Sequence, residues 1–131
     1  MNNISITNKK YDIKDRALDF AARTAKFINA LTKNQITIEH SKQLIRSSSS
    51  IGANIEEADG TLSKKDFINK MAIGRRESRE SKYWLCLIQK IDFITDCKLK
   101  EENAWLINEA RELLLILSSI INNTQIKNNI E

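Results

Sequence analysis

The chain contains no proline, only three glycines and a single histidine among its 131 residues. Proline is the strongest helix breaker, because it lacks a backbone N–H and its ring clashes with the preceding turn. Glycine is the next poorest helix former. A chain with so few breakers can be helical along nearly its whole length. We therefore expect an all-α fold in a single domain spanning residues 1–131.

Few residues are suited to metal or redox chemistry. Cys86, Cys97 and His40 form no metal-ligand spacing, so we expect no metal site and two free thiols in a reducing compartment. The sequence also lacks a glycine-rich phosphate loop, a serine placed with a histidine and an acid, and the Glu-x-x-His pairs that build di-iron sites in helical bundles. These absences predict a noncatalytic protein without a cofactor.

Long apolar runs are missing as well. The longest, residues 113–117, is far shorter than the roughly 20 residues of a membrane-spanning helix. The first ten residues are polar and have no apolar core of signal-peptide length, so we expect a cytoplasmic protein that does not contact membranes. The 21 Lys and Arg against 17 Asp and Glu give a net charge of +4. This excess permits a polyanionic partner without requiring one.

Apolar side chains recur every three or four residues in four stretches, as on the buried face of a helix. The predicted helices are 12–31, 37–59, 63–91 and 99–122. The expected N-caps are Asp12, Thr37 and Ser63. Short connections favour antiparallel neighbours, so we predict an antiparallel up-down-up-down four-helix bundle. Residues 1–10 and 123–131 are expected to be loose tails.

The second and third predicted helices carry small side chains on their inward faces. Ser48 and Gly52 lie on the seam of 37–59, and Gly74 lies on the seam of 63–91. Serine and glycine are poor interior helix formers, so their cost must be offset. We interpret the pattern as a close approach of the two helices, with Gly74 facing Ser48 and Gly52. A frayed helical turn is the alternative.

The charges of the third predicted helix fall on two edges. At about 100° per residue, Lys64, Arg75, Arg79 and Lys82 share one flank of the seam. The other flank carries Glu77, Glu80 and Trp84. A helix with a basic and an acidic edge suits a head-to-tail contact between identical subunits, and such contacts close into rings. A solvated face laced with salt bridges is the alternative.

Glu56 and Glu57 of the second predicted helix are the candidates for general acids. Pairing with Arg75, Arg76 or Arg79 across the helix hairpin is the simpler role, because those cations lie in the facing segment. The candidates for packing and assembly are therefore Ser48, Gly52, Glu56, Glu57, Gly74, Arg75, Arg76, Glu77, Arg79, Glu80 and Trp84.

The sequence resembles the four-helix-bundle proteins encoded in 23S rRNA intervening sequences, also called S23-type ribosomal proteins. The segments that carry the resemblance are 11–13, 43–58, 63–68 and 76–85. The accessory variability protein of diversity-generating retroelements looks like a relative. The resemblance covers most of residues 11–120. It implies a homopentameric ring with a basic surface that binds nucleic acid, and in the retroelement branch a reverse transcriptase partner. It implies no enzymatic activity.

The leading functional hypothesis is an oligomeric scaffold that binds structured RNA or DNA through basic side chains. The candidate contacts are Arg16, Arg23, Lys26, Lys42, Arg46, Lys64 and Lys65. Arg75, Arg76 and Arg79 are expected to be occupied by ion pairs instead. The alternative is a protein-interaction ring, such as an accessory protein of a reverse transcriptase.

Overall fold

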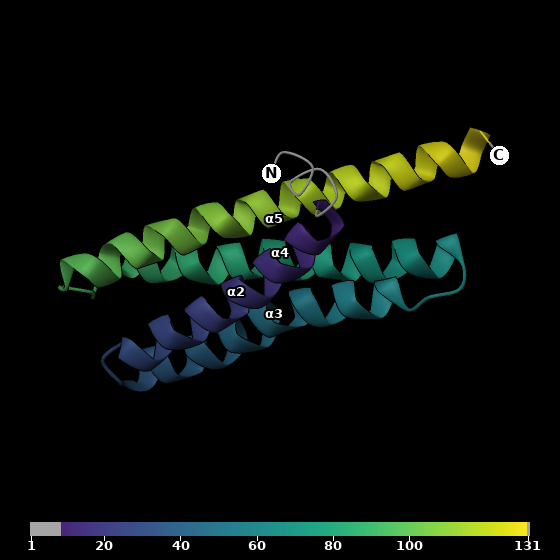
Figure 1. The fold of residues 1–131 in the computed structure, drawn as a ribbon. Helices are drawn as coiled ribbons and strands as arrows, with labels where there is room; N and C mark the ends of the chain where they lie inside the picture. The colour runs from purple at the N-terminus through teal and green to yellow at the C-terminus, as the bar shows by residue number, and fades with distance from the viewer. Residues whose placement is uncertain (1–8, 131) are drawn as a thin grey trace.

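The computed structural model describes residues 9–130, and within them it contains four helices and no strand. The helices are α2 (Lys9–Ala30), α3 (Gln35–Asp59), α4 (Lys64–Ile91) and α5 (Cys97–Ile130), joined by short connections (Figure 1). The predicted all-α class is confirmed for this part of the chain. Each helix lies within a few residues of a predicted one, apart from the longer C-terminal helix.

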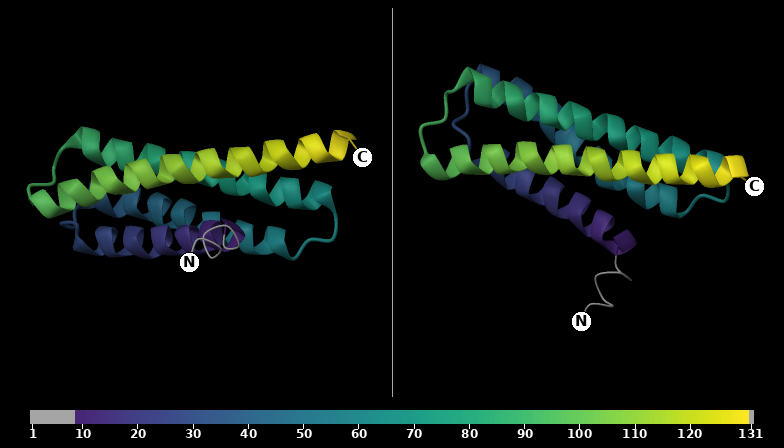
Figure 2. Two further views of the ribbon diagram at one scale, coloured as in Figure 1. Left: turned by 45° about the horizontal axis from the view of Figure 1, so that its top comes forward. Right: turned by 90° about the horizontal axis from the view of Figure 1, so that it is seen from above.

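Every helix packs against two others. α4 contacts α3 and α5, and α2 contacts the same two helices from the opposite side. Figure 2 shows α3, α4 and α5 running side by side, whereas the shorter α2 diverges from them towards its N-terminal end. The core lies between the four helices and contains fully buried side chains from each of them. Its largest members include Phe20, Leu44, Leu85 and Leu113.

Two of the predicted helix starts are wrong. α2 begins at Lys9, so Asp12 lies inside the helix and is not its N-cap. α3 begins two residues before Thr37, because Asn34 is the better cap. The Asn34 side chain accepts a hydrogen bond from the Thr37 N–H at 3.0 Å, and Thr37 Oγ1 accepts one from the Asn34 N–H at 2.8 Å. Ser63 caps α4 as predicted, accepting from the Asp66 N–H at 3.1 Å.

The predicted end of the last helix is also wrong, because α5 continues through residues 123–130. Asparagine-rich composition indicated fraying, yet the segment contains neither proline nor glycine to end the helix. Ile121 is buried against the core, and Thr124 Oγ1 donates a hydrogen bond to the Ile120 carbonyl at 2.7 Å. Of the predicted tail at 1–10, residues 9 and 10 belong to α2, and residues 1–8 lie outside the described residues, as does residue 131.

Small side chains meet where α3 crosses α4. Ser81 Oγ donates a hydrogen bond to Ser47 Oγ at 2.9 Å, and both side chains are fully buried. A Cβ on Gly74 would lie 3.6 Å from the Ile51 carbonyl oxygen. Gly52 differs from the prediction. It faces α2 instead of α4, and a Cβ there would lie 3.5 Å from Ala17 Cβ. The small inward-facing residues of α3 therefore contact two helices, with Ser47 against α4 and Gly52 against α2.

Candidate nucleic-acid interface

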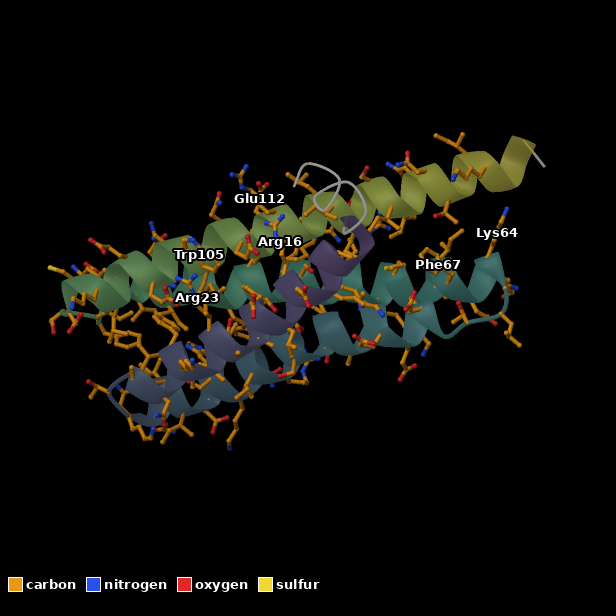
Figure 3. The ribbon with its side chains drawn as sticks, viewed as in Figure 1. Arg16, Arg23, Lys64, Phe67, Trp105 and Glu112 are labelled. Atoms are coloured by element: carbon orange, nitrogen blue, oxygen red, sulfur yellow. The ribbon has the colours of Figure 1, made fainter. Side chains whose placement is uncertain are left out.

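Two of the arginines predicted to contact nucleic acid join α2 to α5. The Arg16 guanidinium donates to both carboxylate oxygens of Glu109 at 3.0 and 2.7 Å. Arg23 binds Glu102 in the same two-pronged way at 2.9 and 2.6 Å, and its guanidinium stacks 3.5 Å from the ring centre of Trp105 (Figure 3). The hydrogen bond from Arg23 lowers the pKa of Glu102. Both arginines therefore serve the fold of the subunit.

A third predicted contact, Arg46, joins α3 to α4. Its guanidinium binds the buried Glu77 at 2.9 Å and also pairs with Glu80. These two acids form the edge of α4 that was predicted to meet a neighbouring subunit, so this edge is occupied within the chain. Trp84 lies on the same side of α4, half-buried, with its ring centre 5.7 Å from that of His40 on α3.

The acids at the end of α3 pair with lysines and not with the arginines of α4. Glu57 lies 2.8 Å from Lys70, whose hydrogen bond lowers the pKa of Glu57. Glu56 lies 3.6 Å from Lys14 of α2. The predicted pairing with Arg75, Arg76 or Arg79 is therefore wrong. The run of pairs along α3 and α4 places Glu57 opposite Lys70, more than a helical turn before those arginines.

Three cations on α4 are not neutralised by an acid in the described part of the chain. Arg75, Arg79 and Lys82 lie within about 60° of one another around the helix axis, at 100° per residue. Glu77 and Glu80 lie on the α3 side, so the three cations lie on the flank next to α5, the other helix that packs against α4. They make no hydrogen bond or ion pair within the described part of the chain. This is the reverse of the prediction for Arg75 and Arg79.

The neighbouring flank of α5 is basic too. Lys100 and Arg111 lie about 160° around the helix from Glu102 and Glu109, which face α2. Lys100 is 3.9 Å from Asp92, and Arg111 donates to the uncharged Asn108 at 2.7 Å. We define the cationic face as Arg75, Arg79, Lys82, Lys90, Lys100 and Arg111.

Charge is thus segregated around α4 and α5. Within the described residues of these two helices, the arc that holds the cationic face contains no Asp or Glu. The row extends back to Lys64 and Lys65 at the start of α4. From Lys64 to Lys90 it is about 39 Å long at 1.5 Å per residue. The modest net charge of +4 therefore understates the local positive potential, because no acid of the described parts of α4 and α5 lies within this arc.

The seven predicted nucleic-acid contacts are consequently split. Arg16, Arg23 and Arg46 are bound by acids, and only Lys64 and Lys65 adjoin the cationic face. The other two, Lys26 on α2 and Lys42 on α3, are exposed elsewhere, with Lys42 3.7 Å from Glu39. Lys90, Lys100 and Arg111 were missed. Plotting the charges of α5 by helical phase, as was done for α4, would have found two of them.

The described residues contain no group of three or more His, Cys, Asp or Glu side chains placed to hold a metal ion. Arg76, expected to pair with α3, lies 3.8 Å from its neighbour Glu77 on the same helix. None of the described helices is both long and apolar enough to cross a membrane.

The sequence matches the model of the family described as 23S rRNA-intervening sequence protein over residues 9–119. The chain belongs to this family. The chain also resembles a solved structure, a protein with unknown function from the S23 ribosomal protein family of Bacteroides thetaiotaomicron VPI-5482. The two are 38% identical with a TM-score of 0.77, covering 87% of this chain and 98% of the other. No curated protein matches the sequence.

Proposed function

We propose that this member of the family is a noncatalytic, oligomeric, cytoplasmic protein that binds structured RNA through its cationic face. The observation that carries the proposal is the segregation of charge on α4 and α5. Arg75, Arg79 and Lys82 are unpaired within the described residues, whereas four acids of the same helices, Glu77, Glu80, Glu102 and Glu109, are engaged by Arg16, Arg23 and Arg46. Cations without acidic neighbours attract phosphate most strongly.

The shape of the face agrees with a nucleic-acid backbone. Its cations follow a nearly straight helix pair and come from both α4 and α5, so they can contact successive phosphates. Arg75 and Lys82 are half-buried, which holds their stems against the surface while the charged ends reach solvent. The family's name associates its members with 23S rRNA, so structured RNA is the first ligand to test and DNA the second.

The oligomer in this proposal is a ring of antiparallel up-down-up-down bundles, with five subunits by family resemblance. Its contacts lie away from the cationic face. An apolar hollow of about 260 Å³ between α2 and α3 is lined by Ile28, Leu31, Lys33, Thr37, Ile38, Ser41, Lys42 and Ile45. Ile38 and Ile45 are 45% and 42% exposed. Exposed apolar side chains grouped in this way favour a protein contact.

This hollow also supports the second candidate function, a protein-interaction ring whose ligand is another protein, such as a reverse transcriptase of a diversity-generating retroelement. That function predicts capture of the partner in nuclease-treated samples, with no dependence on nucleic acid. RNA binding predicts instead that nuclease treatment abolishes the capture of a partner.

A salt titration tests the proposed function. The dissociation constant of the full-length protein for a fluorescently labelled RNA hairpin is measured by anisotropy between 50 and 300 mM KCl. Five or six phosphate contacts predict that the logarithm of the association constant, the reciprocal of the dissociation constant, falls against log[KCl] with a slope of roughly −4 to −5. Absence of binding at 50 mM KCl, or binding with a slope near zero, would contradict the proposal. Light scattering on the same sample, judged against the 15.1 kDa subunit, tests the ring.

A further inference from the structure

One end of the cationic face leads into a hollow with an exposed aromatic ring. The hollow, of about 600 Å³ and open to solvent, lies at the C-terminal end of α4. Its lining residues are Tyr83, Cys86, Leu87, Gln89, Lys90 and Asp92. Lys90 belongs to the cationic face, and Lys82 directly precedes Tyr83 in the sequence. The hollow and the row of cations are therefore continuous along one helix.

The ring of Tyr83 is held in place and yet exposed. Tyr83 is 60% exposed to solvent. Its ring packs edge-on against Trp84, with ring centres 5.4 Å apart and an interplanar angle of 77°. Trp84 is itself packed against His40. Such a ring loses little freedom when a flat ligand stacks on it, and stacking on aromatic side chains is how proteins commonly hold unpaired bases.

The charges at the hollow favour a base over a phosphate. The C-terminal end of α4 carries the negative end of the helix dipole, and Asp92 adds a carboxylate, which lies 3.9 Å from Lys100. The dipole and the carboxylate disfavour a phosphate beside Asp92, whereas Lys90 attracts a phosphate to its own side of the hollow. A neutral base can instead direct a donor towards the Asp92 carboxylate and use the Gln89 amide as donor or acceptor. The phosphates of the same strand would then lie outside, near Lys82 and Lys90.

We propose that the hollow takes one unpaired base of an RNA strand, stacked on Tyr83, while its phosphates lie along the cationic face. This inference rests on the proposed function and refines it from structured RNA to RNA with an accessible loop or end. Bases within a duplex are paired and stacked, so they cannot enter. Adenine can present its exocyclic amino group to the Asp92 carboxylate, whereas the N3–H of uracil lies between two carbonyl oxygens that a carboxylate repels, so adenine binds more tightly than uracil.

The experiment compares three RNAs with full-length protein: a hairpin with an adenine loop, the same stem with a uracil loop, and the blunt-ended stem duplex. Tyr83→Ala is expected to weaken binding of the adenine-loop hairpin about 5- to 150-fold. Binding of the blunt duplex stays within about twofold, and the salt dependence is unchanged because no cation is removed. Tyr83→Phe is the matched control and retains wild-type affinity for all three.

Asp92→Asn tests the preference between bases. Asp92 has a φ of 60°, a left-handed conformation that asparagine also tolerates, so the end of α4 should be preserved. The variant is expected to remove the preference for the adenine loop over the uracil loop. Thermal unfolding of each variant checks that a loss of binding is not a loss of folding.

The outcomes separate the two proposals. If the wild type binds RNA with the expected salt dependence and Tyr83→Ala weakens all three RNAs equally or none of them, the base site is refuted and the cationic face stands. An equal affinity of the wild type for the loop hairpins and the blunt duplex also refutes the base site. If the wild type binds no RNA at low salt, the proposed function fails, and the base site fails with it.

Discussion

The crossing of α3 and α4 at Gly74 predicts opposite effects for a small and a large substitution. A Cβ at this position would lie 3.6 Å from the Ile51 carbonyl oxygen and 3.7 Å from Leu117 Cδ1. These are ordinary van der Waals distances, so a methyl group fits without moving its neighbours. The three further carbons of a leucine would overlap with the backbone carbonyl and the side chains that surround that Cβ.

The size of each effect follows from known helix and packing energies. Alanine is more favourable than glycine in a helix interior by about 0.8–1.0 kcal/mol, so Gly74→Ala should stabilise the fold by close to 1 kcal/mol. For a domain of this size that raises Tm by about 4 °C. Overpacking costs about 1–3 kcal/mol, and the three extra carbons place Gly74→Leu at the upper end of that range, so it should lower the free energy of unfolding by about 2 kcal/mol after the gain in helix propensity.

Urea unfolding followed by circular dichroism measures both changes, provided that the m-value is unaltered. A matched pair on α3 extends the test: Ser48→Leu, at a fully buried position, should destabilise by a similar amount, whereas Ser49→Leu, at an exposed one, should change stability by less than about 0.5 kcal/mol. A destabilised Gly74→Ala would show that the helices approach more closely than described. An unaffected Gly74→Leu would show that they are not in close contact.

Three further predictions concern polar contacts. Ser81→Ala should cost about 1 kcal/mol, because Ser47 keeps its own bond to a backbone carbonyl, and a double-mutant cycle with Ser47→Ala should give a coupling energy clearly above zero. Glu102→Gln should lower the free energy of unfolding by roughly 1 kcal/mol at pH 7. Because Arg23 lowers the pKa of Glu102 in the folded state below 4.5, this difference from wild type should persist above pH 4.5 and vanish as the pH falls through the lowered pKa. A difference in stability that does not change with pH would contradict the ion pair. Arg46→Ala should lower stability by about 1–2 kcal/mol in urea unfolding, and a neutral effect would show that its two carboxylates do not depend on it.

Most of the helical frame could be predicted, because hydrophobic periodicity and the absence of proline are local properties of the sequence. The helix starts were less accessible. Asn34 and Thr37 are both good capping residues, and only the reciprocal pair of hydrogen bonds decides between them. The extension of α5 past residue 122 agrees with the absence of proline and glycine from residues 123–130, a signal that the prediction ranked below their asparagine-rich composition.

The candidate site was only half predictable. Helical phase separated the basic and acidic edges of α4, but it could not tell which neighbouring helix each edge meets. That depends on the rotation of α4 about its axis within the bundle. Glu77 and Glu80 face Arg46 within the same subunit, which leaves Arg75 and Arg79 unpaired among the described residues. The partners of the charges therefore had to come from the structure.

The central claim is that RNA binds the face formed by α4 and α5 and not the basic residues elsewhere. It is tested by two triple variants that remove the same charge from different places. One changes Arg75, Arg79 and Lys82 to Gln on the cationic face. The other changes to Gln three exposed lysines that lie outside both the cationic face and the apolar hollow, namely Lys26, Lys98 and Lys127.

Affinity for the RNA hairpin is measured for both variants across a KCl series. The first triple is expected to weaken binding strongly at 50 mM KCl and to reduce the magnitude of the salt slope by about 2–3, because three phosphate contacts are lost. The second should retain a slope close to that of the wild type. Equal losses in the two variants, or a greater loss in the second, would contradict the assignment of the cationic face as the RNA-binding surface.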